Sequence, residues 1–106
     1  MLASQIAVSP CSNPDMRLDD VLRAYSSLGY TRFEVFTSWA KSAFDYHADP
    51  RAYLEIGSRF GMAFTSFHLP PISANDPGSF ESAVVAARFA AALGVDVVLY
   101  KASDIE

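Results

Sequence analysis

Three glycines recur at nearly constant spacing, each between a helical pattern and a strand-like run. They are Gly29, Gly61 and Gly94, so the two intervals are 32 and 33 residues. Glycine directly after a helix adopts the left-handed conformation that closes the last turn, because it has no Cβ to clash. The period therefore predicts a strand-plus-helix unit that is used three times and is followed by a fourth strand.

The apolar residues between the glycines locate these elements. Strands are expected over 6–8, 32–37, 62–67 and 95–100, and helices over 18–28, 50–60 and 80–93. Asp49 and Ser79 stand where capping side chains are preferred, and Pro50 suits the first helical position. Because each helix carries the chain back across the sheet, consecutive strands should be parallel.

Composition narrows the class of protein. About half of the 106 residues are hydrophobic (51%), which suffices for the core of one domain. Eight basic residues are scattered among twelve acidic ones, so no nucleic-acid partner is expected, because affinity for phosphates needs grouped Lys and Arg. The single cysteine, Cys11, cannot form an intrachain disulfide, and no targeting or membrane-spanning pattern is present. The sequence therefore predicts a cytoplasmic protein without a membrane partner.

Three segments that follow strands are long and rich in polar residues or proline, namely 9–17, 38–48 and 69–78. They lie at the carboxyl ends of the expected parallel strands, where α/β proteins bind their ligands. The sequence predicts a site at this end of the sheet, drawn from Ser9, Cys11, Thr37, Trp39, His68 and Lys101.

Two of these strand ends resemble a known superfamily. The segment 29–36 reads Gly-Tyr-Thr-Arg-Phe-Glu-Val-Phe, and 67–71 reads Phe-His-Leu-Pro-Pro. Both are similar to the second and third strands of xylose-isomerase-like barrels, which include sugar phosphate isomerases, epimerases and endonuclease IV relatives. The resemblance implies a parallel (βα)3β segment, half of a TIM (β/α)8 barrel. Residues 1–106 are then expected to be one partial domain, truncated after its fourth strand.

The same resemblance implies a function. The chain looks like the amino-terminal part of a metal-dependent sugar or sugar phosphate isomerase or epimerase, and is expected to be inactive alone. Its substrate would be a small sugar or hydroxy-carbonyl compound. A divalent metal (Mn, Mg, Co or Zn) is implied for the complete barrel, with its main ligands beyond Glu106, so tight binding to this chain alone is not expected.

Two residues are candidates for chemistry. His68 could assist ring opening, hydrogen-bond a sugar hydroxyl or ligate a metal; alternatively it is a strand-end histidine bonded to a neighbouring loop. If Phe33 and Val35 face the helices, strand alternation sends Glu34 and Phe36 to the opposite face. The resemblance implies that Glu34 supports the residues of the site and is not the proton-transfer base. The alternative is an ion pair with a basic residue on an adjacent strand.

Three further residues are candidates for substrate binding. Trp39 could stack on the apolar face of a sugar, as could Phe44 and Tyr46 in the same loop, or it could pack that loop against the rim. Cys11 and Lys101 are weaker candidates, whose plain interpretations are a buried thiol and a solvated amine. His47 is expected to be an exposed loop residue.

A rival hypothesis is a non-catalytic module, either a half-barrel or a flavodoxin-like domain, that binds a ligand or assembles with a partner. Four parallel strands with helices on one face only would leave the other face bare. That arrangement predicts self-association or a complementing half-barrel.

Overall fold

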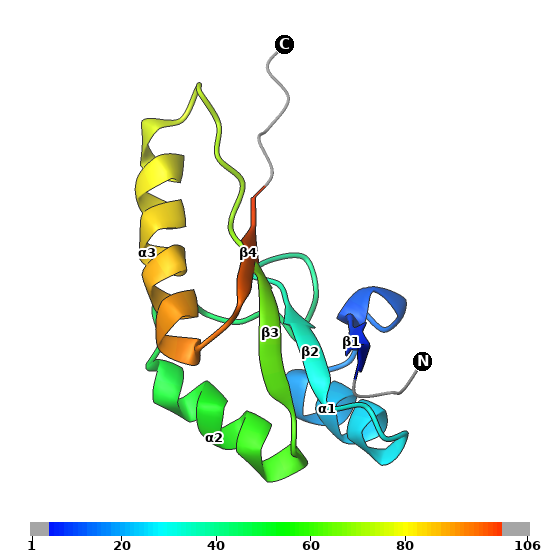
Figure 1. Ribbon diagram of the computed structural model, residues 1–106. Helices are drawn as coiled ribbons and strands as arrows, with labels where there is room; N and C mark the ends of the chain where they lie inside the picture. Colours follow the sequence, from blue (N-terminus) through cyan, green and yellow to red (C-terminus); the bar gives the residue numbers. More distant parts are fainter. Residues whose placement is uncertain (1–4, 101–106) are drawn as a thin grey trace.

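The computed structural model describes residues 5–100 and has an α/β architecture. Four parallel strands form one sheet in the order β1-β2-β3-β4, with three α-helices between them in sequence (Figure 1). The strands are β1 (Ala7–Val8), β2 (Arg32–Val35), β3 (Ala63–His68) and β4 (Val97–Leu99). The helices are α1 (Leu18–Ser27), α2 (Pro50–Phe60) and α3 (Pro77–Leu93), and a short 3-10 turn, η2 (Pro10–Ser12), follows β1.

The strand order confirms the predicted repetition of strand and helix. Each strand pairs in parallel with its neighbour in sequence, as β1 with β2, β2 with β3, and β3 with β4. The flavodoxin-like alternative is wrong, because in that fold the first strand lies between the second and the third.

The helix ends show why these residues form these elements. Gly61 and Gly94 cap α2 and α3 with φ of 66° and 78°, and Gly29 after α1 has φ of 94°, so the glycine period is confirmed. The Asp49 carboxylate accepts a hydrogen bond of 2.9 Å from the backbone N–H of Arg51 and caps α2 as predicted.

The start of α3 differs from the prediction. The helix begins at Pro77 and is capped by Asp76, whose carboxylate accepts from the Gly78 N–H, so the assignment of Ser79 as the cap was wrong. Pro77 occupies the first helical position, where the missing N–H costs nothing. The Ser79 hydroxyl instead accepts from the Ser73 N–H at 2.8 Å and donates to backbone carbonyls, which holds the preceding turn.

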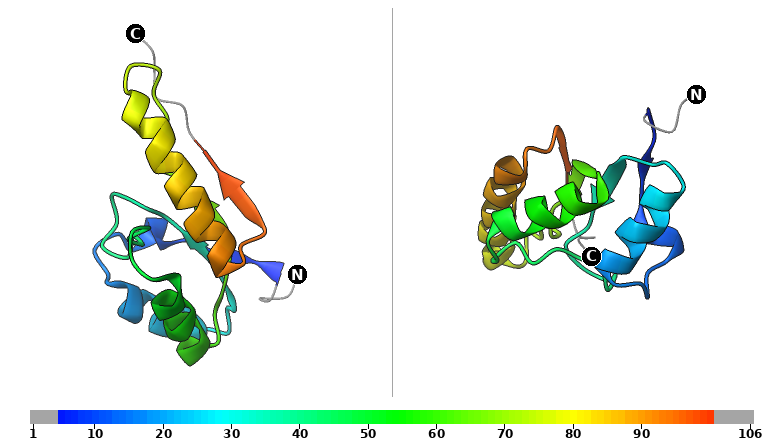
Figure 2. Two further views of the ribbon diagram at one scale, coloured as in Figure 1. Left: turned by 90° about the vertical axis from the view of Figure 1, so that its left-hand side faces the viewer. Right: turned by 90° about the horizontal axis from the view of Figure 1, so that it is seen from below.

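The core lies between the sheet and the helices. Figure 2 shows α2 and α3 side by side on one face of the sheet, and α1 next to α2 along it. Phe33 and Val35 of β2 are fully buried on this face, which meets the condition under which Glu34 was expected to face the other way. The other large buried side chains come from both layers: Leu18, Val21, Leu22, Met62, Phe64, Phe67, Phe89 and Leu93.

An extra residue in β3 changes which side chains face the core. Phe33 pairs with Phe64, but the next residue, Glu34, pairs with Ser66. Thr65 therefore has no pairing partner on β2. Such a bulge resets the alternation of the strand. Phe64 and Phe67 therefore both reach the helix side, although they are three residues apart.

The opposite face of the sheet bears no α-helix among the described residues (Figure 2). At the edge, the side chains from Val97 to Tyr100 are 39% to 69% exposed. Among residues 5–100, no helix has the length and apolar character needed to cross a membrane.

Candidate functional site

Glu34 and His68 meet at the carboxyl end of β2 and β3, on the face away from the helices. His68 Nε2 lies 3.0 Å from Glu34 Oε1, and the two side chains are 31% and 27% exposed. The contact has the distance of an ion pair but not the alignment of a hydrogen bond, and Nε2 is buried without another polar partner among the described residues. Hydrogen bonds in unliganded sites often align only when a ligand is bound.

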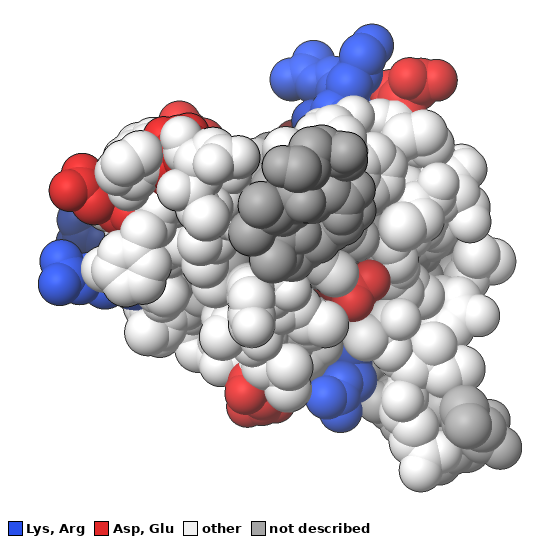
Figure 3. Space-filling view, turned by 90° about the horizontal axis from the view of Figure 1, so that it is seen from above, with Lys and Arg blue, Asp and Glu red and all other residues white. Residues whose placement is uncertain are grey.

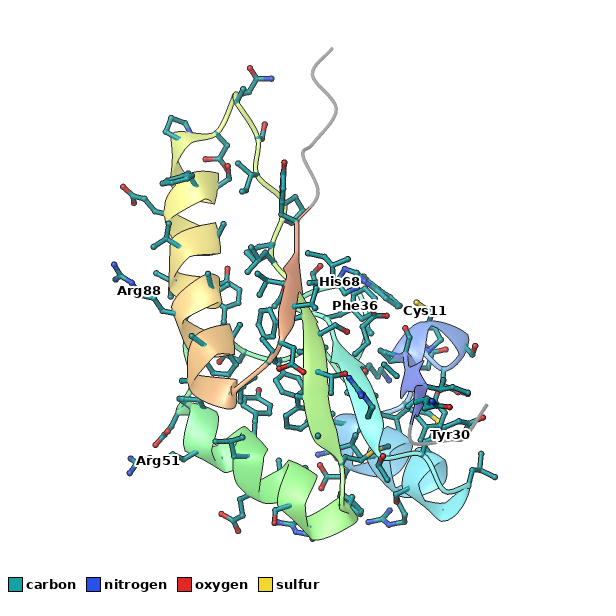
Figure 4. All side chains as sticks on the ribbon, viewed as in Figure 1. Cys11, Tyr30, Phe36, Arg51, His68 and Arg88 are labelled. Carbon is teal, nitrogen blue, oxygen red and sulfur yellow. The ribbon has the colours of Figure 1, made fainter. Side chains whose placement is uncertain are left out.

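The imidazole of His68 is held in place by an aromatic ring. Phe36 stacks on it with ring centroids 4.0 Å apart and planes within 8° of parallel. The Thr37 hydroxyl donates a 3.0 Å hydrogen bond to the His68 backbone carbonyl, which ties the end of β2 to the end of β3. Figure 4 shows His68 and Phe36 next to each other at this end of the sheet. Ring and backbone are thus fixed independently.

Trp39 stands at the rim of the same site. Its ring contacts Phe36 edge to face at 4.9 Å, and 56% of the residue is exposed. Its backbone φ is 62°, and among non-glycine residues of the described chain it is the one with positive φ. Holding a bulky residue there costs roughly 1 to 3 kcal/mol, and such residues cluster at ligand sites. The loop therefore presents an aromatic surface to solvent at an energetic cost.

These side chains line a pocket of about 280 Å³. This volume is slightly below the range of about 300 to 1,000 Å³ that is typical for drug-sized ligands. It therefore suits a small molecule of a few carbons. The lining residues are Phe36, Thr37, Ser38, Trp39, His68, Leu69 and Pro71.

The structure brings together Thr37, Trp39 and His68 of the predicted site, with Glu34 behind His68. Cys11 lies at the same end of the sheet on η2, but lines a separate pocket (Figure 4). Its interpretation as a buried thiol was wrong, because Cys11 is exposed. Lys101 lies outside the described residues.

The separate pocket is organised by Tyr25. Its hydroxyl donates to Asn13 Oδ1 at 2.7 Å and to the Ser9 backbone carbonyl at 3.2 Å. Burial raises the pKa of the Tyr25 phenol above its ordinary value, and the neighbouring Cys11 raises it further. Ser9 donates to Cys11 Sγ at 3.0 Å. These bonds anchor the loop after β1 to α1.

The aromatic residues of the loop 38–48 divide into two groups. Phe44 is only 2% exposed and stacks on Tyr53 in the core at 4.1 Å, so the suggestion that it binds a sugar was wrong. Tyr46 is half-buried and packs against the core cluster. His47 is exposed, as predicted. Trp39 thus remains the aromatic side chain of this loop that faces the pocket.

Sequence reasoning missed Ser66, whose hydroxyl lies 3.5 Å from Glu34 Oε1. The usual alternation of a strand places Phe64 and Ser66 on one face and Phe67 on the other, which hid the role of this serine. Two phenylalanines three residues apart, both needing burial, were the available signal for a bulge.

A larger cavity of about 620 Å³ lies at the opposite, amino end of the strands. It is an open hollow beside the end of α2 and contains Arg32, Thr65 and Asp96. In parallel α/β sheets ligands bind beyond the carboxyl ends of the strands, so size alone does not make this hollow the site.

The metal implied by the resemblance can be tested against the side chains present. A useful zinc or manganese site needs three or four converging ligands. Glu34 and His68 supply two, and within residues 5–100 no three His, Cys, Asp or Glu side chains converge. The described residues therefore do not fit a metal centre by themselves.

The arrangement can bind and exchange a proton. Because Nε2 faces a carboxylate, the neutral imidazole is expected to carry its proton on Nε2, which leaves Nδ1 as an acceptor. The contact with Glu34 uses Nε2, so Nδ1 is the ring nitrogen that could accept a hydrogen bond from a ligand hydroxyl.

No protein-family model matches the sequence, and no curated protein is significantly similar to it.

Proposed function

We propose that this chain forms part of a sugar-binding α/β barrel of the xylose-isomerase-like type, and that the pocket beside His68 binds a small sugar or hydroxy-carbonyl compound. The observation that carries this proposal is the 3.0 Å contact between His68 and Glu34 next to an exposed tryptophan. The parallel order of the strands is compatible with half of a TIM barrel, in which sites lie at this end.

In the proposed site, His68 Nδ1 accepts a hydrogen bond from a substrate hydroxyl and can take its proton. The positive charge that then forms on the imidazole is balanced by the Glu34 carboxylate, 3.0 Å from Nε2. Phe36 fixes the ring plane, and Trp39 covers the apolar face of the sugar. The resemblance implies a divalent metal, which would act as a Lewis acid in the complete barrel. Because the described residues do not fit a metal, we assign these residues only binding and proton exchange.

Trp39 is the single tryptophan of the chain and lines the pocket, so its fluorescence reports binding directly. Titration with D-xylulose should give a saturable change with a dissociation constant in the millimolar range. His68→Gln should weaken this binding about tenfold, the loss of roughly one hydrogen bond. His47→Gln, an exposed histidine outside the pocket, is the matched control and should have no effect. If D-xylulose at concentrations well above about 1 mM gives no saturable change in fluorescence, the proposal is contradicted.

An assembly role is a second candidate, favoured by the exposed strand β4. Val97, Val98, Leu99 and Tyr100 form an uncharged apolar run at the sheet edge. Such an edge is a ready template for pairing with another strand. We propose that its partner is a second copy of this chain.

Two copies related by a twofold axis could pair β4 of each with β1 of the other, since all four strands are parallel and β1 forms the opposite edge. The eight strands would then close without a free edge. Light scattering after size exclusion should give twice the monomer mass of 11.5 kDa. Val98→Lys should shift the protein to monomer, whereas Val85→Lys on the exposed side of α3 should not. A wild-type monomer that unfolds cooperatively would overturn this second candidate.

A further inference from the structure

The described residues that line the pocket beside His68 include no basic side chain. Its seven lining residues include no Lys or Arg, and the charged group nearest to its imidazole is the Glu34 carboxylate at 3.0 Å. Figure 3 looks down on the carboxyl ends of the strands; outside the grey atoms, most of the surface that it shows is uncharged, and the Lys and Arg side chains lie towards its outline. The local field therefore does not favour an anion.

Phosphate groups are recognised in proteins by Lys or Arg side chains, or by the free backbone N–H groups at helix N-termini. The lining of the pocket includes no residue from the first turn of α1, α2 or α3. Within residues 5–100, the lining of this pocket thus offers neither of the two usual means of phosphate binding. A phosphate dianion next to Glu34 would instead meet a like charge.

The polar groups that are present suit neutral hydroxyls. His68 Nδ1 offers an acceptor, and the exposed Ser38 hydroxyl offers both a donor and an acceptor. Phe36 and Trp39 provide two apolar surfaces whose ring planes are 71° apart. We propose that the part of the ligand held in this pocket is uncharged, namely a polyol or hydroxy-carbonyl group without phosphate. This inference rests on the proposed function and concerns the part of the substrate that lies at the carboxyl ends of β2 and β3.

The test compares D-xylulose with D-xylulose 5-phosphate, using Trp39 fluorescence and the NMR signals of His68 as readouts. The neutral sugar should bind at least as tightly as its phosphate ester. Ser38→Lys places a cation on the exposed rim and should strengthen binding of the ester about tenfold relative to binding of the neutral sugar. Ser27→Lys, at the far end of α1, changes the net charge equally and should leave both affinities unchanged.

The outcomes separate the two proposals. If the ester binds the wild-type protein tenfold more tightly than the sugar, this inference is overturned while the proposed function stands. In that case Lys101→Met would show whether Lys101 supplies the missing charge. If neither compound changes either readout, both proposals fail. Tighter binding of the sugar, with reversal by Ser38→Lys, supports both.

Discussion

Glu34 pairs with Ser66 across β2 and β3, although the preceding pair along the ladder is Phe33 with Phe64. The bulge at Thr65 causes this shift, and it has two effects. It keeps Phe67 on the helix side with no exposed surface, and it places His68 on the same face as Glu34. The bulge thus accommodates Thr65 without changing the face that either side chain occupies.

Deletion of Thr65 should therefore be tolerated. Without the extra residue, regular alternation keeps Phe67 on the helix side and His68 on the face of Glu34. We expect a loss of about 1 kcal/mol in the free energy of unfolding, roughly that of one hydrogen bond. Deletion of Glu34 is the control, because β2 has no extra residue and the deletion would turn Val35 out of the core, at a cost of about 3 kcal/mol or more. Urea unfolding followed by circular dichroism measures both losses, and equal losses for the two deletions would refute the role of the bulge.

The Glu34 carboxylate should select the tautomer of His68. In the wild-type protein at high enough pH to keep imidazole neutral, nitrogen NMR should show His68 mainly protonated on Nε2. Glu34→Ala removes the carboxylate and should move the tautomer ratio towards that of exposed His47. The chain has two histidines, so His47 is an internal reference in the same spectrum. Identical ratios for the two residues in the wild-type protein would mean that Glu34 does not control the ring.

Much of the fold follows from local signals, because glycine period, capping residues and apolar spacing all depend on near neighbours. Three features were predictable in this way: the parallel strands, the face of the sheet on which Glu34 lies, and the position of His68 at a strand end. The contact between Glu34 and Ser66 was not, because it depends on a bulge that only the packing of Phe64 and Phe67 requires. The separation of Cys11 from His68 was also hidden, since it depends on how η2 folds back onto Tyr25.

Two glycine-to-alanine substitutions should differ in their effect on the stability of the fold. Gly57 lies inside α2 against β3, and a Cβ there would approach the Met62 carbonyl oxygen to 2.8 Å and the Phe64 ring to 3.0 Å. Gly57→Ala should destabilise by roughly 1 to 3 kcal/mol, despite the higher helix propensity of alanine. Gly78, in the first turn of α3, has only Asp76 Oδ1 at 3.4 Å from such a Cβ. Gly78→Ala should be neutral or stabilise by up to about 1 kcal/mol. Thermal unfolding of the pair provides the measurement, and a stabilising Gly57→Ala would show that α2 does not approach β3 this closely.

The raised pKa of Tyr25 predicts a loss of stability at alkaline pH. Burial disfavours the phenolate, so the folded chain holds the proton more strongly than the unfolded chain, whose tyrosine has the ordinary pKa of 10.0. This contribution is fully present below pH 10.0 and is lost as the pH rises from there through the folded pKa.

Tyr25→Phe should remove that part of the loss of stability at alkaline pH. At neutral pH it should cost about 1 kcal/mol, because Asn13 and the Ser9 carbonyl lose their donor. Tyr30→Phe, which removes a half-buried phenol from the lining of the same pocket, is the control and should retain the decline. Denaturant unfolding between neutral pH and pH 11 or so would test this, and parallel profiles for the wild-type and Tyr25→Phe proteins would contradict the assignment.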